Sequence, residues 1–250
     1  MTTPEAGAGG TTGGAGALGA LLLADARLPT GGHAHSGSLE GAVAAGLEPK
    51  EVPAYIEARL RTVARTEAAA AVLARRAARA TGGGGATATA ADIDYGPIQA
   101  ALAARTPSAP LRAASASLGR GLARLARRLR ADHPAVLALP TASAPTPGLR
   151  PLRPVVLGAL GAALDMADDQ VARAALYDDA QTVASAALKL LPGDPVTAVE
   201  WVLDTGDALE EGVTAALAVT GPDRLPACSA PLIDQWAGAH AHATRRLFHA

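Results

Sequence analysis

The chain has 250 residues with 22 basic and 23 acidic side chains, and its formal net charge of −1 argues against bulk nucleic-acid binding. Hydrophobic residues make up 49% of the chain but aromatic residues only 2%, so the expected core consists of Ala, Leu and Val. The single cysteine, Cys228, excludes an intramolecular disulfide and a multi-cysteine metal site, and it is typical of a protein of the reducing cytoplasm.

The pattern of the chain predicts an all-α fold, because no segment alternates apolar and polar residues as a strand does. Residues 1–17 are rich in Gly and Thr and predict a disordered tail, and residues 18–250 predict one multi-helix, bundle-like domain. The apolar run 18–24 is too short for a membrane span, and no basic segment precedes it to make it a signal peptide. Pro, Gly and cap residues delimit the expected helices: roughly 18–28, 36–45, 49–80, 94–104, 111–130, 155–164, 168–191, 195–217 and 231–247.

The clearest periodicity lies in residues 111–130. Apolar or small residues recur there at steps of four and three and predict one buried face: Leu111, Ser115, Leu118, Leu122, Leu125 and Leu129. Arginines occupy the other sides: Arg112, Arg120, Arg124, Arg127, Arg128 and Arg130. Such a face is most often only solvated. If it binds a macromolecule, a protein is favoured over nucleic acid, because no aromatic residues are interleaved to stack bases.

Catalytic motifs are absent from the sequence. The Gly-rich stretch at 30–38 contains no lysine, and neither Lys50 nor Lys189 follows a glycine loop, so no Walker-type nucleotide site is expected. No G-x-S-x-G segment offers a catalytic serine. The tandem acids at 168–169, 178–179 and 210–211 are expected at helix caps and on solvated faces. We therefore assign no catalytic residue and no cofactor.

Histidines are the remaining candidates for metal chemistry. His33 and His35 are two residues apart in a turn, where such a pair can chelate a metal ion. His240 and His242 have the same spacing, but on a helix they would face different directions. Without an organised carboxylate partner, ordinary polar histidines are the favoured interpretation, and a metal site is the alternative.

The segment LLLADARLPTGGHAHSGSLEGAV, residues 21–43, resembles the N-terminal signature of the urease accessory protein UreF family. That family reads as a leucine-rich helix, an L-P-x-G turn with an aromatic-Ser-x-Ser segment, and Gly-Leu-Glu at the start of the next helix. Leu28, Pro29, Ser36, Leu39 and Glu40 match this order. The aromatic positions of the family carry His33 and His35 here.

Three further blocks follow in the family's order. Leu111-Arg112 with Ser117-Leu118-Gly119 resembles its Leu-Arg…Gly block, and residues 154–192 resemble the region that ends in Leu191-Pro192. After that point Gly193-Asp194-Pro195 replaces the usual Leu-Gly-Gln. The last residues, 230–250, resemble the family's tail through Asp234, His240, Arg246, Leu247 and Phe248, with Ala241 in place of an expected glutamate.

The resemblance implies a non-enzymatic, homodimeric, all-α chaperone of the cytoplasm that contacts neither nucleic acid nor membrane. It would bind UreD (also called UreH), recruit the GTPase UreG, dock on apo-urease and promote GTP-dependent nickel insertion. Partner contacts are expected at the residues that carry the resemblance: His33, His35, Ser36, Leu39, Glu40, Arg112, Gly119, Leu191, Pro192, Asp194, His240, Arg246, Leu247 and Phe248. Two alternatives stay open: a metallochaperone that binds nickel through His33 and His35, or a helical protein-binding module for another partner. For Phe248, packing into the chain's own core is as good a prediction as an interface contact.

Overall fold

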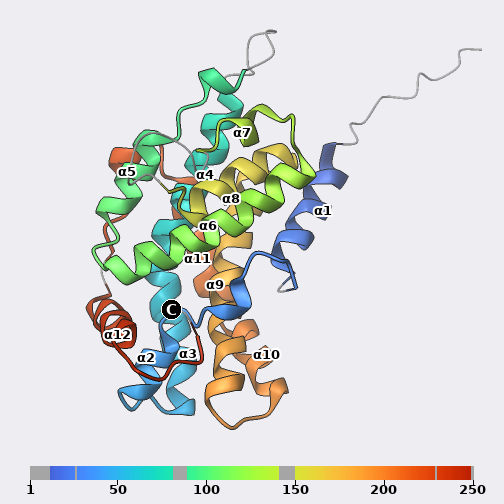
Figure 1. The fold of residues 1–250 in the computed structure, drawn as a ribbon. Helices are drawn as coiled ribbons and strands as arrows, with labels where there is room; N and C mark the ends of the chain where they lie inside the picture. The colour runs from blue at the N-terminus through green and yellow to red at the C-terminus, as the bar shows by residue number, and fades with distance from the viewer. Residues whose placement is uncertain (1–11, 26, 81–88, 141–149, 229, 249–250) are drawn as a thin grey trace, which may run out of the picture.

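The structure, a computed structural model of the chain, describes residues 12–25, 27–80, 89–140, 150–228 and 230–248. Every regular element in these ranges is helical, which confirms the all-α prediction (Figure 1). The α-helices are α1 (Thr12–Ala24), α2 (Leu39–Ala44), α3 (Val52–Arg61), α4 (Val63–Ala80), α5 (Gly96–Ala104), α6 (Ala109–Leu129), α7 (Pro134–Leu137), α8 (Arg153–Ala163), α9 (Asp168–Leu190), α10 (Pro195–Asp204), α11 (Gly206–Leu217) and α12 (Pro231–Ala241). Short 3-10 turns are η1 (Gly32–Ala34), η2 (Pro49–Glu51), η3 (Ala90–Asp92) and η4 (Pro222–Arg224).

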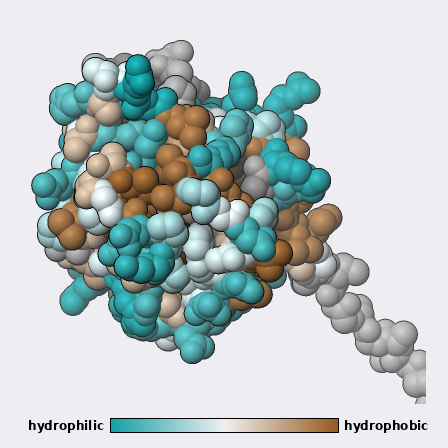
Figure 2. Space-filling view, turned by 90° about the horizontal axis from the view of Figure 1, so that it is seen from below, coloured by the Kyte–Doolittle hydropathy of each residue, from teal (hydrophilic) through white to brown (hydrophobic). Residues whose placement is uncertain are grey.

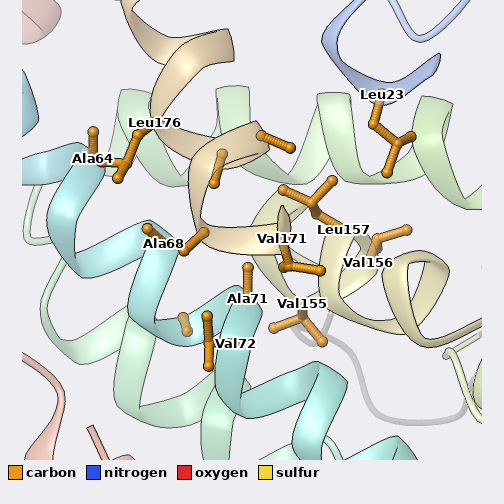
Figure 3. Packing of buried hydrophobic residues seen from close by; sticks show 14 of the residues in the cluster. Leu23, Ala64, Ala68, Ala71, Val72, Val155, Val156, Leu157, Val171 and Leu176 are labelled. Atoms are coloured by element: carbon orange, nitrogen blue, oxygen red, sulfur yellow. The ribbon is translucent and has the colours of Figure 1, made fainter. Parts of the chain in front are cut away.

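Helices α4, α8 and α9 form the centre of the core, and α6 and α8 cross in front of α4 and α9 (Figure 1). The side chains between them are small: Ala68, Ala71 and Val72 of α4 lie against the Val155–Leu157 segment of α8 and Val171 of α9 (Figure 3). A Cβ at Gly158 would lie 2.1 Å from the carbonyl oxygen of Ala71, so the backbones of α4 and α8 are in direct contact. Close backbone approach thus takes the place of the large side chains that the composition lacks.

Helix α1 begins six residues earlier than predicted. Residues 12–17 were expected in a disordered tail, and that prediction is wrong, because they form the first turns of the helix. Glycines explain the packing there: a Cβ at Gly16 would lie 2.5 Å from the carbonyl oxygen of Asp165, and one at Gly19 would lie 3.1 Å from Leu164 Cβ. Helix α1 therefore lies directly on the α8–α9 connection. Residues 1–11 lie outside the described ranges.

Helix α2 is shorter than the predicted segment 36–45. Gly37 and Ser38 have φ angles of 59° and 68°, which are left-handed and cannot belong to a right-handed helix. The helix therefore starts only at Leu39.

Two predicted long helices are each divided in two. Thr62 separates α3 from α4 within 49–80, and Thr205 separates α10 from α11 within 195–217. In both cases the threonine hydroxyl donates to a carbonyl of the preceding turn, Ala58 at 2.6 Å and Val202 at 2.8 Å. Threonine side chains that hydrogen-bond to the backbone compete with regular helix geometry, and Gly206 directly after Thr205 weakens the second helix further. Thr66 makes the same type of bond inside α4 without a break, so the bond alone does not divide a helix. The predicted flexible glycines 82–85 after α4 lie outside the described residues.

The predicted last helix, 231–247, ends at Ala241, and residues 243–248 leave it as a tail. On α6 the buried face consists mostly of small residues: Ala116, Gly119, Leu122, Ala123 and Ala126. Leu129, predicted to be buried, is 45% exposed. The small residues lie against α8, and the longer leucines of the predicted stripe flank this contact line.

Other apolar side chains are exposed as well, notably Leu18, Leu21 and Leu22 on α1 and Val196, Val199 and Leu203 on α10. From below, the side on which α10 lies in Figure 1, apolar residues form patches among hydrophilic ones (Figure 2). No helix in the described ranges has both the length and the apolar character needed to cross a membrane.

Candidate functional site: the 28–38 turn and the C-terminal tail

The turn between α1 and α2 depends on glycines with left-handed backbone. Gly31 has φ 88° and Gly37 has φ 59°. A Cβ at Gly37 would lie 3.2 Å from Val183 Cγ2 and 3.4 Å from the guanidinium carbon of Arg59. The turn is thus packed against α3 and α9, and both backbone conformation and space favour glycine at position 37.

A buried arginine holds this turn in place. The Gly37 carbonyl accepts hydrogen bonds from Tyr55 Oη at 2.7 Å and Arg59 Nη1 at 2.9 Å. Arg59 is 5% exposed and pairs with Asp179 through two further bonds of 2.5 and 2.9 Å. Burial alone would lower the pKa of Arg59, but the charge and hydrogen bonds of Asp179 outweigh it and raise the pKa. Burial also raises the pKa of Tyr55 to about 12, so both side chains stay protonated as donors.

Two tandem acids of α9 that were expected on a solvated face are partly buried and form ion pairs. Asp179 pairs with Arg59, and Asp178 pairs with Arg153 at 2.7 Å. The prediction for these two residues is wrong, because α9 is covered on several sides and its acids meet arginines of α3 and α8. Burial raises the pKa of Asp178, although Arg153 acts in the opposite direction.

Glu40, at the start of α2, connects the tail to the turn. Its carboxylate accepts the backbone N–H groups of Leu247 at 2.6 Å and Phe248 at 2.9 Å, and it lies 2.7 Å from His240 Nε2. Burial would raise the pKa of Glu40, but the two backbone hydrogen bonds and His240 outweigh it and lower the pKa. The carboxylate is therefore ionised, and His240 Nε2 carries the proton of their hydrogen bond.

The tail also reaches α9 through Lys189. Lys189 Nζ lies 5.1 Å from the ring centroid of Phe248 and donates to the carbonyl of His33 at 3.3 Å. His33, His35 and Phe248 line one side of a cavity of about 100 Å³ whose other wall includes Asp178 and Arg153. The turn, α9 and the tail thus meet at one place.

Glu67 of α4 lies in the wall between two further cavities. One, of about 80 Å³, is lined by Arg59, Arg153 and Asp179, and the other, of about 230 Å³, by Arg105, Cys228 and Asp234. No hydrogen bond or ion pair to Glu67 is found among the described residues. Burial, with the nearby charge of Asp179, raises the pKa of Glu67 to about 7.

Comparison with known proteins shows the family to which the chain belongs. The sequence model of the UreF family matches residues 48–205, more than half of the chain. The chain belongs to the UreF family. The urease accessory protein UreF of Mycobacterium sp. strain JLS is 36% identical over 232 residues, which cover 91% of this chain and 96% of that protein. Those of Mycolicibacterium vanbaalenii and Mycobacterium tuberculosis strain H37Ra are 36% and 34% identical, with the same coverage. The chain is therefore similar over nearly its whole length to proteins that carry this name.

The structure brings together most of the residues that carried the UreF resemblance at the two ends of the chain. Glu40, His240, Leu247 and Phe248 share hydrogen bonds, and His33 contacts the same tail through Lys189. Several of these side chains are buried within this chain: His35, Ser36, Leu39, His240 and Phe248. In this conformation they shape the site from within, and their role in partner binding stays a prediction. For Phe248 the structure shows the core-packing alternative, since the side chain is 5% exposed.

The other predicted UreF residues have local contacts. Arg112 donates to the carbonyls of Thr106 and Pro107, and Gly119 lies against the carbonyl of Pro151. The α9–α10 connection consists of Leu191, Pro192, Gly193 and Asp194, whose carboxylate accepts the N–H of Val196 as a helix cap. No hydrogen bond or ion pair among the described residues joins these side chains to the cluster around Glu40. Their role in partner binding stays a prediction.

Metal binding has limited support in the geometry. Within the described ranges, no three His, Cys, Asp or Glu side chains gather closely enough to hold a metal ion. His240 is buried and His242 is exposed, as expected for two residues that face different directions on a helix.

Sequence reasoning did not find the Arg59–Asp179 pair, although a signal was present. Arg59 recurs at helical spacing with Val52, Tyr55 and Ile56, all of which are buried. A charged residue on an otherwise apolar helix face predicts a buried ion pair, because an unpaired buried charge is costly. Its partner 120 residues away had no such signal.

Proposed function

We propose that this chain is a non-enzymatic scaffold of urease maturation. It binds UreD (UreH), recruits the GTPase UreG, and docks with them on apo-urease to promote GTP-dependent nickel insertion. It acts in the cytoplasm as a homodimer and as one domain, which begins with helix α1 at Thr12. The partners supply nucleotide chemistry, since this sequence has no Walker loop.

The observation that carries the proposal is the composite surface at the site. Three segments far apart in the sequence, the 28–38 turn, the end of α9 and the tail, are held together by Glu40 and Lys189. His33, Arg246 and Leu247 are exposed there, next to the buried contacts that fix their backbone. A surface that is ordered before binding loses less conformational entropy on association, which favours a docking role.

Reconstitution tests the proposal. The purified chain is mixed with cognate UreD, UreG and apo-urease, with and without GTP, and size-exclusion chromatography follows the complex. We expect co-elution with UreD and UreG, no GTP hydrolysis by the chain alone, and urease activation only when the chain is present. GTP hydrolysis by the isolated chain, or no co-elution under any nucleotide condition, would contradict the scaffold.

A further inference from the structure

Helix α6 carries a row of arginines that no acidic side chain neutralises. Arg120, Arg124 and Arg128 are exposed and four residues apart, which places successive side chains about 6 Å apart along one side of the helix. The helix lies across the front of the molecule in Figure 1. None of the three arginines takes part in an ion pair of the described residues, and Arg120 donates only to Ser117 Oγ.

The sequence leaves little to neutralise this row from within the chain. Seven arginines and no aspartate or glutamate lie from position 105 to position 131, and the next acid, Asp132, forms no ion pair among the described residues. The residues outside the described ranges contain a single acid, Glu5. The positive charge of α6 is therefore available to another molecule.

Exposed arginines outside the row are of two kinds, those that pair with acids and those that do not. Four of them pair with acids: Arg27 with Asp25, Arg61 with Glu57, Arg79 with Asp165 and Arg224 with Asp223. Besides the row on α6, the exposed arginines without an acid among the described residues are Arg130, Arg150, Arg245 and Arg246. Like charges four residues apart on a helix repel and weaken it. The row on α6 is thus unfavourable for folding, and a bound acidic partner would offset the repulsion.

The composition of α6 and α7 favours a protein over a nucleic acid as that partner. Neither helix contains an aromatic residue on which bases would stack. Leu129 and Leu137 are 45% and 58% exposed, but with about 3.6 residues per turn Leu129 lies on the opposite side of α6 from Arg120, so the leucines are not part of the row.

We propose that the α6 surface, defined as Arg120, Arg124 and Arg128, binds an acidic surface of a partner protein in the maturation complex. The inference rests on the proposed function, because it assigns one of that complex's contacts to α6. A second copy of this chain also offers acids, since seven of them and no basic residue lie from position 190 to position 223. That contact would join two different surfaces of the same chain and would form open chains unless its rotation closed a ring, so a separate protein is favoured.

The test reverses charge on the row and on a matched set. The variant Arg120→Glu, Arg124→Glu, Arg128→Glu is compared with Arg61→Glu, Arg79→Glu, Arg224→Glu, which changes the net charge equally at paired positions on other elements. A third variant replaces the row by lysine and keeps its charge. Dissociation constants of the complex with UreD, UreG and apo-urease are measured from about 50 to 200 mM salt, where screening of exposed charges changes most. Circular dichroism melts confirm that each variant folds.

We expect the glutamate row to weaken assembly by about tenfold or more at low salt and to flatten its salt dependence, while the matched and lysine variants resemble wild type. Equal affinity and salt dependence of the glutamate row and wild type would overturn the inference and leave the proposed function intact. If wild type forms no complex, the proposed function fails. Poly-L-glutamate then serves as the probe for α6. Binding of this probe that requires the three arginines supports the inference, and no binding overturns the inference. Stronger binding of a duplex DNA than of poly-L-glutamate through these arginines overturns the choice of a protein.

Discussion

At the scale of single residues, Glu40 and Glu67 show how surroundings decide the behaviour of a carboxyl group. Glu40 accepts two backbone N–H groups and one histidine N–H, and its pKa is lowered. Glu67 lies between cavities without such donors, and its pKa is raised to about 7. The first carboxylate stabilises the fold when it is ionised, and the second destabilises the fold when it is ionised.

Replacing Glu40 by glutamine should destabilise the protein and release the tail. An amide offers one neutral acceptor oxygen where the carboxylate receives three donors, and buried hydrogen bonds to a charged group contribute about 1.5–3 kcal/mol. Urea unfolding should show a loss of this size, and residues 247–248 should become sensitive to protease. Glu200→Gln, at an exposed position without a recorded ion pair, is the control and should leave both measurements unchanged. Equal behaviour of the two variants would contradict the role of Glu40.

Glu67 should make the protein less stable as pH rises from about 5 to 8. Its folded pKa of about 7 lies above the ordinary value of 4.5, so the folded state binds more protons than the unfolded state in this window. Stability then falls with rising pH, by about 1.4 kcal/mol per unit of pKa difference at most. Glu67→Gln should remove this slope and raise the free energy of unfolding at pH 8 by roughly 2–3 kcal/mol. Denaturant unfolding at both pH values measures it, and an unchanged slope in the variant would show that Glu67 is not the titrating group.

At the scale of elements, glycines set how closely helices approach. A Cβ at Gly119 of α6 would lie 2.0 Å from the carbonyl oxygen of Pro151. A Cβ at Gly193 would meet no atom within 4 Å. Gly119→Ala should therefore separate α6 from the segment leading into α8 and cost about 1–3 kcal/mol. Gly193→Ala should be neutral or stabilise by up to about 1 kcal/mol. Thermal melts of both variants check this, and a neutral Gly119→Ala would mean that the contact relaxes freely.

The tail offers two adjacent residues with opposite expectations. Phe248 is 5% exposed and Leu247 is 61% exposed. Phe248→Ala should lower stability by about 3 kcal/mol, because it removes buried aromatic area and leaves a cavity, while Leu247→Ala should cost less than about 0.5 kcal/mol. Binding of UreD and UreG measured alongside the melts separates packing from interface. Lost binding in Leu247→Ala with an unchanged melt assigns the exposed leucine to a partner contact; an unchanged melt in Phe248→Ala would contradict core packing.

Helix positions followed from the sequence better than helix ends did. Proline at the first turn located α5, α6 and α8 to within a few residues, and α9 begins at the predicted Asp168 with acids in its first turn. The breaks at Thr62 and Thr205 have no Pro or Gly before them, and a side-chain bond to the backbone is not visible in a hydrophobic pattern. The helical residues 12–17 were hidden for a related reason: Gly and Thr are poor helix formers, and only contact with the α8–α9 connection stabilises them.

For the candidate site as well, the sequence indicated individual residues but not the contacts between them. Resemblance between short motifs located Glu40, His240 and the tail, but nothing local indicated that they meet, since 200 residues separate Glu40 from His240. The buried pair of Arg59 with Asp179 joins α3 to α9 in the same way. Long-range pairs depend on the packing of whole helices, which periodicity does not specify.

At the scale of the whole molecule, charge is segregated along the chain although the total is −1. Positive charge gathers on α6 and negative charge between positions 190 and 223. Screening leaves such charged surfaces effective over about 8 Å at physiological salt. The unpaired arginines of α6 are suited to bind an acidic partner, which agrees with the proposed role in assembly.

The histidines of the turn decide between a scaffold and a nickel carrier. His33 is exposed, whereas His35 is 9% exposed in a cavity wall, so the two histidines differ in how much packing they contribute. His33→Ala should leave the melting temperature unchanged, and His35→Ala should lower it, because it removes a packed side chain.

For a scaffold, equilibrium dialysis with nickel should show no tight stoichiometric site in wild type, in either variant, or in the control His242→Ala. Complex formation and urease activation should then persist in His33→Ala. The opposite result has two parts: a tight nickel site in wild type that is lost in His33→Ala but kept in His242→Ala, and lost urease activation although the complex still assembles. This result would establish the direct nickel carrier instead, because a purely structural histidine would not change metal affinity without changing assembly.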